Sequence, residues 1–115
     1  MPEHLGHAYY KYYAYIAQDE LAQGWDRDRV SRAITALGIP CATGSCSEIY
    51  LEKAFPNQWR PRNRCVVARE LGESSLMFLV HPTLTDADIE ETAETARKVM
   101  SQASRVTRKV MAAGA

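Results

Sequence analysis

The strongest structural signal in the sequence is a long amphipathic helix, predicted over residues 86–111. Thr85 and Asp88 form a capping box, in which each side chain hydrogen-bonds the backbone N–H group of the other residue. Acidic residues gather in the first half of the segment and basic residues in the second half, which complements the helix macrodipole at both ends. The apolar positions share one face: Ile89, Ala93, Ala96, Met100, Ala103, Val106 and Val110. A helix of this length rises about 39 Å, more than a small sheet requires, so we expect its overhang to pack on another chain or to fray.

Three shorter segments are predicted as the strands of a sheet. Residues 8–16, AYYKYYAYI, contain five of the six tyrosines, and this density of aromatic residues favours a strand. Both faces of this strand are aromatic or amphipathic, so we expect it to be covered on both sides, in part by another domain. Residues 75–80 form a second strand that His81 ends, and residues 39–42 form a third, which Pro40 places at a sheet edge.

Helices are predicted between these strands. Asp26 is a suitable N-cap for a helix through Leu37, and Gly38 follows at the usual position for a helix end.

Two shorter helices are predicted after the edge strand. Ser47 is expected to cap a helix over residues 47–55, and Asn63 to cap another over residues 63–71 that Gly72 ends.

The order of elements indicates the fold class. Few strands with helices between them favour an α/β (α+β) fold, a two-layer sandwich in which helices cover one face of a small, mostly antiparallel sheet of about three strands. The other face of the sheet then needs a cover. At 115 residues, the chain is expected to form a single domain over residues 1–115.

Charge and hydropathy exclude several classes of partner. Fourteen basic residues balance fourteen acidic ones, so the chain lacks the electrostatic footprint of a protein that binds nucleic acid or an anionic membrane. The sequence begins MPEHLGH, without the apolar run of a signal peptide, and its longest apolar stretch, residues 76–80, is too short to cross a bilayer. Three sparse cysteines fit a reducing compartment better than a secreted disulfide framework. We therefore expect a cytoplasmic protein.

The cysteines and histidines do not form a recognisable metal site. Four residues separate Cys41 from Cys46, and Cys65 and His81 lie far along the chain, so the closely spaced pairs of structural zinc sites are missing. We predict no metal ligands. A cysteine-dependent enzyme with Cys46 as nucleophile is a weaker alternative, because nothing in the sequence brings His7 or His81 near that thiol.

The segment most suggestive of function is residues 39–55, IPCATGSCSEIYLEKAF. A short strand runs into a bend rich in Gly, Ser and Cys, and a predicted helix begins directly behind it. Such a bend places hydroxyl groups, backbone N–H groups and a carboxylate at a helix N-terminus, which suits an anionic or polyhydroxy ligand.

Three other patterns each have a functional and a structural interpretation. Glu48 and Glu52 lie one helical turn apart, either as paired carboxylates or on a solvated helix face. Arg60, Arg62 and Arg64 either meet a phosphate or occupy an exposed loop, and the exposed loop is favoured. The tyrosine-rich strand is either a stacking platform for bases or sugars or an aromatic core or interface. The second interpretation is favoured, because stacking platforms for nucleic acid lie in basic grooves.

Three stretches of the sequence are typical of one enzyme family. They are HAYYKYYAYI, WDRDRVSRAITALGIPCATGSCSEIYLEKAF and ARELGESSLMFLVHPTLTDADIEETAETARKV. Over about residues 7–100 the chain resembles the C-terminal part of a pyridoxal-phosphate (PLP)-dependent sugar aminotransferase of the DegT/DnrJ/EryC1/StrS family. The strings GSCSEIYLEKAF and SLMFLVHPTLT are the most specific parts of this resemblance.

The resemblance implies the small-domain part of PLP-transferase fold type I, in an enzyme that is usually a homodimer. It implies a reaction that moves an amino group, typically from glutamate, to a keto group of a nucleotide-activated sugar. It also implies that Ser45, Ser47 and Glu48 of the bend, together with Tyr50, line the substrate cleft. His81, after the last strand, either lines the same cleft or is a structural histidine.

The groups that perform this chemistry have no counterpart in the chain. None of its lysines lies in the family's Schiff-base context: Lys11, Lys53, Lys98 and Lys109. We therefore expect no catalytic residue and no PLP bound to this chain alone. The expected partners are the large PLP-binding domain of the parent enzyme, a second copy in a homo-oligomer, and the nucleotide sugar that the complete enzyme binds. The alternative is a free-standing α/β interaction module, derived from such an enzyme, that binds a protein through its tyrosine-rich strand.

Overall fold

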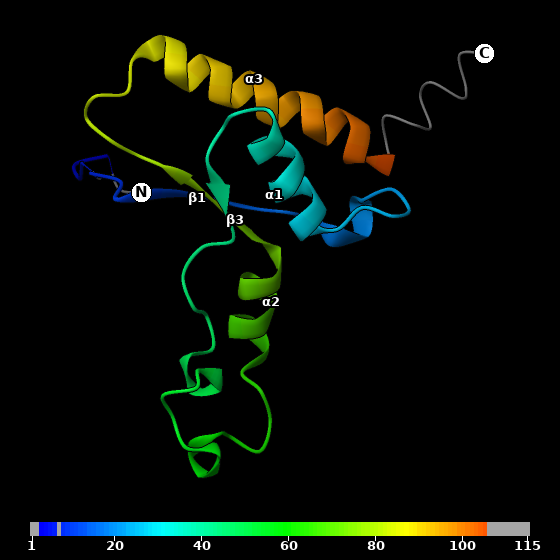
Figure 1. Cartoon of the computed structure of the whole chain (residues 1–115). Coiled ribbons are helices and arrows are strands. Elements are labelled where there is room, and N and C mark those ends of the chain that lie inside the picture. Colours follow the sequence, from blue (N-terminus) through cyan, green and yellow to red (C-terminus); the bar gives the residue numbers. More distant parts are fainter. Residues whose placement is uncertain (1–2, 7, 106–115) are drawn as a thin grey trace.

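A three-stranded antiparallel sheet lies at the centre of the computed structural model, which describes residues 3–6 and 8–105 (Figure 1). The strands are β1 (Lys11–Tyr15), β2 (Cys41–Ala42) and β3 (Ser75–Leu79), and β3 is central. The helices are α1 (Arg27–Ala36), α2 (Val66–Ser74) and α3 (Asp86–Ala103). Short 3₁₀ turns occur at Gln18–Glu20, Ile49–Leu51 and Asn57–Trp59. The predicted fold class is confirmed: a small α+β unit with an antiparallel sheet and a long final helix.

The hydrophobic core lies between one face of the sheet and the pair formed by α1 and α3. Leu76 and Phe78 of β3 alternate toward this core, and the side chains of Val30 and Ile34 on α1 are fully buried in it. Burial of one such side chain contributes about 1.5–3 kcal/mol. The buried apolar residues are Ile16, Leu21, Ala22, Val30, Ile34, Ile39, Leu76, Val99 and Ala103.

The opposite face of the sheet is not covered by α1 or α3. The β1–β3 register directs Tyr13, Tyr15, Met77 and Leu79 to this side, and we call these four residues the open face. Tyr15 is 57% exposed and Leu79 is 56% exposed. Coverage of this face by another domain stays a prediction.

The helix predicted after Asp26 is confirmed, together with both of its end signals. A carboxylate oxygen of Asp26 accepts a hydrogen bond from the Arg29 N–H group at 2.6 Å. Gly38 follows the helix with φ of +93°, a left-handed conformation that glycine adopts without steric penalty.

The strands lie where they were predicted, but all three are shorter, β3 by a single residue. β2 is at the sheet edge, as Pro40 indicated, and only Cys41–Ala42 of it pairs with β3. β1 begins at Lys11 rather than at residue 8, because Tyr9 has φ of +45°, which interrupts an extended backbone.

The predicted helix over residues 47–55 is wrong. A single 3₁₀ turn forms at Ile49–Leu51, and Ser47 does not cap it. The carboxylate of Glu48 is buried and bonded to Arg64 instead of lying on a solvated helix face, so the backbone around it follows this contact. A helix this short has little stability of its own to oppose such a contact.

The helix predicted over residues 63–71 is present, but both of its ends were wrong. α2 begins at Val66 after Cys65, with no side-chain cap, so Asn63 does not cap it. Gly72 was expected to end the helix and instead lies inside it, at a point where Ser47 approaches the helix closely.

The capping box that begins α3 is confirmed. The side chain of Thr85 accepts a hydrogen bond from the Asp88 N–H group at 3.2 Å. The carboxylate of Asp88 accepts one from the Thr85 N–H group at 2.7 Å.

The apolar face of α3 is buried only toward the end of the helix. Val99 and Ala103 are buried in the core where α3 packs against α1, whereas Ile89 is 57% exposed. The predicted extension to residue 111, with Val106 and Val110, lies outside the described residues. Within residues 3–6 and 8–105, no helix combines the length and the apolar character that a bilayer crossing demands.

Residues 43–74, between β2 and β3, project away from the sheet, and we call them the arm (Figure 1). Only one side chain of the arm is buried, and it is the carboxylate of Glu48. The arm therefore has no hydrophobic core of its own. Its exposed apolar side chains are Ile49, Leu51, Trp59, Val66, Val67 and Leu71.

Candidate functional site

The bend at the start of the arm, residues 43–48, lies against the end of the sheet where β3 begins. The hydroxyl of Ser75 donates a hydrogen bond to the Thr43 carbonyl oxygen at 2.7 Å. The hydroxyls of Ser45 and Tyr13 lie 3.0 Å apart, so the bend is also fixed to β1. Ser45 and Ser47 are both exposed residues of this bend; the Ser45 hydroxyl bonds Tyr13, and the Ser47 hydroxyl lies against Gly72.

Gly44 permits this close approach of the bend to β1. Its φ is +88°, and a Cβ atom at this position would lie 2.8 Å from a ring carbon of Tyr13. Any larger residue would therefore be strained and would also displace the tyrosine ring.

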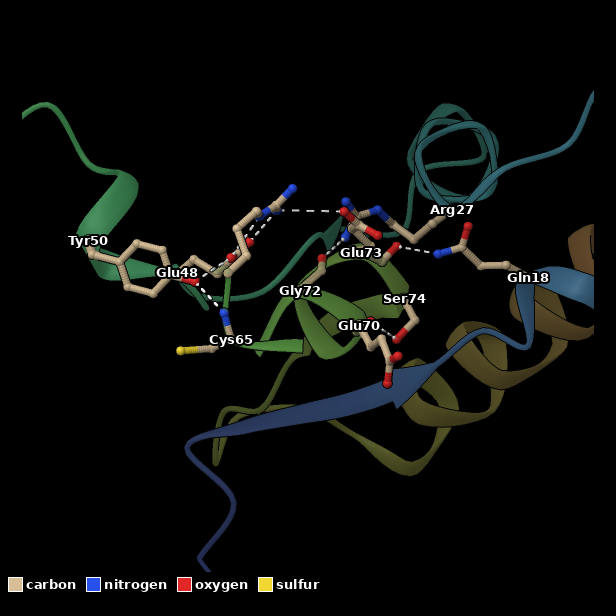
Figure 2. A network of polar contacts seen from close by, with 10 residues as sticks. Gln18, Arg27, Glu48, Tyr50, Cys65, Glu70, Gly72, Glu73 and Ser74 are labelled. Atoms are coloured by element: carbon tan, nitrogen blue, oxygen red, sulfur yellow. Dashed lines mark hydrogen bonds and ion pairs between the residues drawn. The ribbon is translucent and has the colours of Figure 1, made fainter. Parts of the chain in front are cut away.

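Glu48 is the centre of a polar network in the arm (Figure 2). Its carboxylate is 7% exposed and bonds the Arg64 guanidinium through both oxygens, with the Arg64 Nε donating to Oε1 at 2.9 Å. The Tyr50 hydroxyl donates to the same Oε1 at 2.6 Å and accepts from the Cys65 N–H group at 2.9 Å. We call this network of Glu48, Tyr50, Arg64 and Cys65 the clasp.

The clasp shifts the pKa values of its members in opposite directions. Hydrogen bonds from Arg64, and then from Tyr50, lower the pKa of the Glu48 carboxyl to about 2. The hydrogen bond to the Glu48 carboxylate raises the pKa of the Tyr50 hydroxyl, because it stabilises the protonated phenol. Glu48 is therefore a firmly ionised carboxylate with its oxygens already engaged, which makes it a poor general base.

Two side chains connect the far end of the arm to the body of the protein (Figure 2). The Arg27 guanidinium donates to the carbonyl oxygens of Gly72 and Ser75, at 2.8 and 3.0 Å. The Gln18 amide donates to the Glu73 carbonyl oxygen at 3.0 Å. The junction of α2 with β3 is thus fixed by donors that come from the segment before α1 and from α1 itself.

Ser47 packs directly on α2 at Gly72. A Cβ atom on Gly72 would lie 2.0 Å from the Ser47 hydroxyl oxygen and 2.9 Å from its Cβ. No side chain larger than hydrogen fits at residue 72 while Ser47 keeps its position.

His81 lies apart from the other predicted site residues. It follows the end of β3 opposite to the bend, about 20 Å along an extended strand from Ser75. Its ring Nδ1 bonds the Thr83 hydroxyl at 2.7 Å within the turn that leads to α3. The structure therefore brings Ser45, Ser47, Glu48 and Tyr50 together in the arm and leaves His81 elsewhere.

The suggested carboxylate pair does not form. Glu48 bonds Arg64, whereas Glu52 accepts a hydrogen bond from the Cys46 thiol at 3.1 Å. That bond raises the pKa of the Cys46 thiol, which disfavours the thiolate that a nucleophile needs. All three thiols are free, and the described residues contain no group of three or more His, Cys, Asp or Glu side chains suited to a metal ion.

Sequence reasoning missed the importance of Arg64. Arg60, Arg62 and Arg64 looked equivalent as an exposed basic cluster, but of these three arginines only Arg64 forms an ion pair within the described residues. The sequence offered only the chemical expectation that a glutamate needs a cation once it is buried. No spacing rule identifies which arginine supplies that cation.

Comparisons with known proteins show what the chain is similar to. No protein-family model matches the chain, and no curated protein matches it either. Among solved structures, the X-ray structure of the aminotransferase from Psychrobacter cryohalolentis is similar, with 54% sequence identity and a TM-score of 0.80. The chain is similar to part of an aminotransferase. The match covers 84% of this chain and 25% of that chain, so this chain spans about a quarter of the aminotransferase it matches.

Proposed function

We propose that this chain is the C-terminal small domain of a PLP-dependent aminotransferase of the DegT/DnrJ/EryC1/StrS family. In the complete enzyme, an amino group would pass from glutamate to a keto group of a nucleotide-activated sugar. In that reaction, this chain forms one wall of the substrate cleft.

The observation that carries the proposal is the match to the Psychrobacter cryohalolentis aminotransferase. An identity of 54% over 84% of this chain includes the body of the fold as well as the arm, since 84% cannot be reached without part of both. The resemblance of the GSCSEIYLEKAF and SLMFLVHPTLT strings to sugar aminotransferases supports the narrower family and substrate class.

The exposed apolar side chains support a role as part of a larger protein. Within the described residues, Trp59, Val66 and Val67 of the arm are 64%, 58% and 67% exposed, and Tyr15 and Leu79 of the open face are 57% and 56% exposed. The open face and the apolar side chains of the arm are the surfaces that we assign to the large PLP-binding domain and to a second copy in a homo-oligomer.

The described residues of this chain do not fit a PLP site. A Schiff-base lysine needs a desolvated pocket, but Lys53 and Lys98 are exposed, and the Lys11 ammonium lies over the Tyr10 ring at 5.2 Å. The hollow beside Arg27 and Glu73 and the hollow between β1 and α3 have no lysine in their linings. Lys109 lies outside the described residues. We therefore assign the cofactor to the large domain, and we expect the complete enzyme in the cytoplasm.

Within the substrate cleft, we assign the contacts with sugar hydroxyls or with the amino donor to Ser45 and Ser47. Both residues are exposed at the bend, and a hydroxyl can donate one hydrogen bond and accept others, so each can bond a polyhydroxy ligand in addition to its present neighbour. Glu48 and Tyr50 are weaker candidates, because their polar atoms already bond within the clasp. His81 would reach the same substrate only if that substrate extends along the whole sheet.

The proposal is tested with a chimera in which this chain replaces the matched quarter of the Psychrobacter cryohalolentis aminotransferase. We expect the chimera to form a Schiff base with PLP and to retain amino transfer, whereas the enzyme without that quarter loses it. Replacing Ser45 and Ser47 together with alanine should raise KM for the amino acceptor, and Ser101→Ala, an exposed serine on α3, is the matched control. A chimera that folds and binds PLP but is as inactive as the shortened enzyme would contradict the proposal.

A second test uses this chain alone. PLP is added, the absorbance is followed for a Schiff-base band, and borohydride trapping with peptide mapping locates any labelled lysine. We expect no specific labelling. Stoichiometric labelling of one lysine would mean that the chain holds its own cofactor site.

The second candidate function, a free-standing interaction module, is favoured by one observation, the exposure of the tyrosine-rich strand. Tyr10 is 84% exposed and Tyr12 is 55% exposed. An aminotransferase large domain encoded in frame upstream would exclude this candidate.

A further inference from the structure

The arm lacks the interactions that normally hold a protein segment in one conformation. Its only buried side chain is the carboxylate of Glu48, and its large apolar side chains are exposed. The hydroxyls of Tyr13 and Ser45 hold the bend to β1, and donors from Arg27, Gln18 and the Ile16 N–H group fix the far end of the arm. Between these two anchors, the path of the chain depends on contacts within the arm, which are the packing of Ser47 on Gly72 and the polar contacts of the clasp.

The clasp joins the beginning of the arm to the beginning of α2. Arg64 bonds both oxygens of the Glu48 carboxylate, and this two-point contact fixes orientation as well as distance. Tyr50 adds a second connection in the same direction, since its hydroxyl bonds Glu48 on one side and the Cys65 backbone on the other. The loop over residues 51–63 is closed by these contacts.

The charges around Glu48 show that the arrangement depends on Arg64. Arg69 on α2 also contributes positive charge near Glu48, but it forms no ion pair with it within the described residues. Glu73 lies 3.7 Å from the Arg64 guanidinium and competes weakly for it. Without Arg64, the buried carboxylate loses both charge-assisted bonds, and an uncompensated buried charge is strongly unfavourable.

We infer that Arg64 is a positioning residue, which holds the arm closed on Glu48 and thereby fixes Ser47, one residue before Glu48, and the Ser45 hydroxyl beside it. The ordering of the arm is independent of the proposed enzymatic function. The effect on substrate binding rests on that proposed function, because it assumes that Ser45 and Ser47 face the substrate.

The ordering is tested by hydrogen–deuterium exchange on the full chain. Arg64→Ala should accelerate exchange of the amides in residues 43–65 by at least about tenfold, while the amides of β1, β3 and α1 keep their protection. Arg62→Ala is the matched control, because Arg62 is an exposed arginine of the same loop with no ion pair in the described structure, and it should leave exchange unchanged. Unchanged exchange of the arm in folded Arg64→Ala would overturn the inference.

Two further measurements separate a specific contact from general damage. Millimolar guanidinium ion should restore protection of the arm in Arg64→Ala, whereas methylammonium should not, because only guanidinium supplies two parallel donors. Arg64→Lys should show intermediate exchange, since it keeps the charge and loses the two-point contact. Equal exchange in Arg64→Lys and the unchanged protein would also overturn the inference.

The chimera described above gives the functional readout. Arg64→Ala in the chimera should raise KM for the amino acceptor about tenfold and leave the Schiff-base absorbance unchanged. An unchanged KM together with accelerated exchange would overturn the positioning of Ser45 and Ser47. Loss of activity in the unsubstituted chimera would instead contradict the proposed function, and the conclusion drawn from hydrogen exchange about Arg64 would still hold.

Discussion

The packing of Ser47 on Gly72 gives an unusual prediction for a helix glycine. Gly72 lies inside α2 and does not have a positive φ, so alanine is compatible with the backbone. At an ordinary helix position, replacing glycine with alanine stabilises the helix by about 0.8–1.0 kcal/mol. At residue 72 the new Cβ would lie 2.0 Å from the Ser47 hydroxyl oxygen and 2.9 Å from its Cβ. Rotation of the hydroxyl relieves the first contact, but only a backbone shift relieves the second.

The gain in helix propensity and the overpacking against Ser47 oppose each other, and the overpacking is larger. Overpacking of this kind costs about 1–3 kcal/mol. With a cost of about 2 kcal/mol and a gain of about 1 kcal/mol, Gly72→Ala should lower the free energy of unfolding by about 1 kcal/mol. The measurement is urea unfolding followed by far-UV circular dichroism, supplemented by hydrogen exchange of α2 in case the arm opens locally.

A double-mutant cycle isolates the contact. In the Ser47→Gly background both clashing atoms are absent, so Gly72→Ala should raise the free energy of unfolding by about 1 kcal/mol. In the Ser47→Ala background only the contact with the hydroxyl is removed, and the effect should be intermediate. A stabilising Gly72→Ala in the unsubstituted protein would refute the close packing of the bend on α2.

The remaining predictions concern the core, the helix cap, the clasp and the thiols. Ile34→Ala should lower the free energy of unfolding by about 2–5 kcal/mol in a thermal or urea melt, because the Ile34 side chain is fully buried. Thr85→Ala should cost about 0.5–2 kcal/mol by removing half of the capping box, whereas a loss near zero would show that the cap is dispensable. Because the pKa of Glu48 is lowered to about 2 from 4.5, the ionised carboxylate stabilises the arm fully above pH 4.5, and this stabilisation is lost as the pH falls toward 2. Hydrogen exchange of the arm at several pH values measures this loss. Since the bond to Glu52 raises the pKa of the Cys46 thiol, Glu52→Gln should speed alkylation of Cys46 by iodoacetamide at neutral pH.

The parts of the fold that follow short-range rules could be predicted from the sequence. Asp26 and Thr85 are caps because their side chains reach N–H groups three residues away, and such contacts can be read from local spacing. The strand over residues 75–80 was evident because a strongly apolar stretch of this length is typical of a central strand.

The arm could not be predicted in this way, because its structure depends on contacts between distant residues. Glu48 and Arg64 are 16 residues apart, and Ser45 and Tyr13 are 32 residues apart. Local propensity favoured a helix after Ser47, and the ion pair between the buried Glu48 and the half-exposed Arg64 overrode it. Likewise, Gly72 looked like a helix end, and only the position of Ser47 reveals why glycine is needed inside α2.

The two ends of the arm lie side by side on the sheet. Ala42 pairs with Met77, and the Ser75 hydroxyl bonds the Thr43 carbonyl oxygen, so the chain leaves and re-enters the sheet at neighbouring positions. Because the cost of closing a loop grows only slowly with its length, a segment inserted between such points can lengthen, shorten or change sequence at little cost to the rest of the fold. Residues 43–74 can therefore diverge in length and sequence while the sheet and its two covering helices stay as they are.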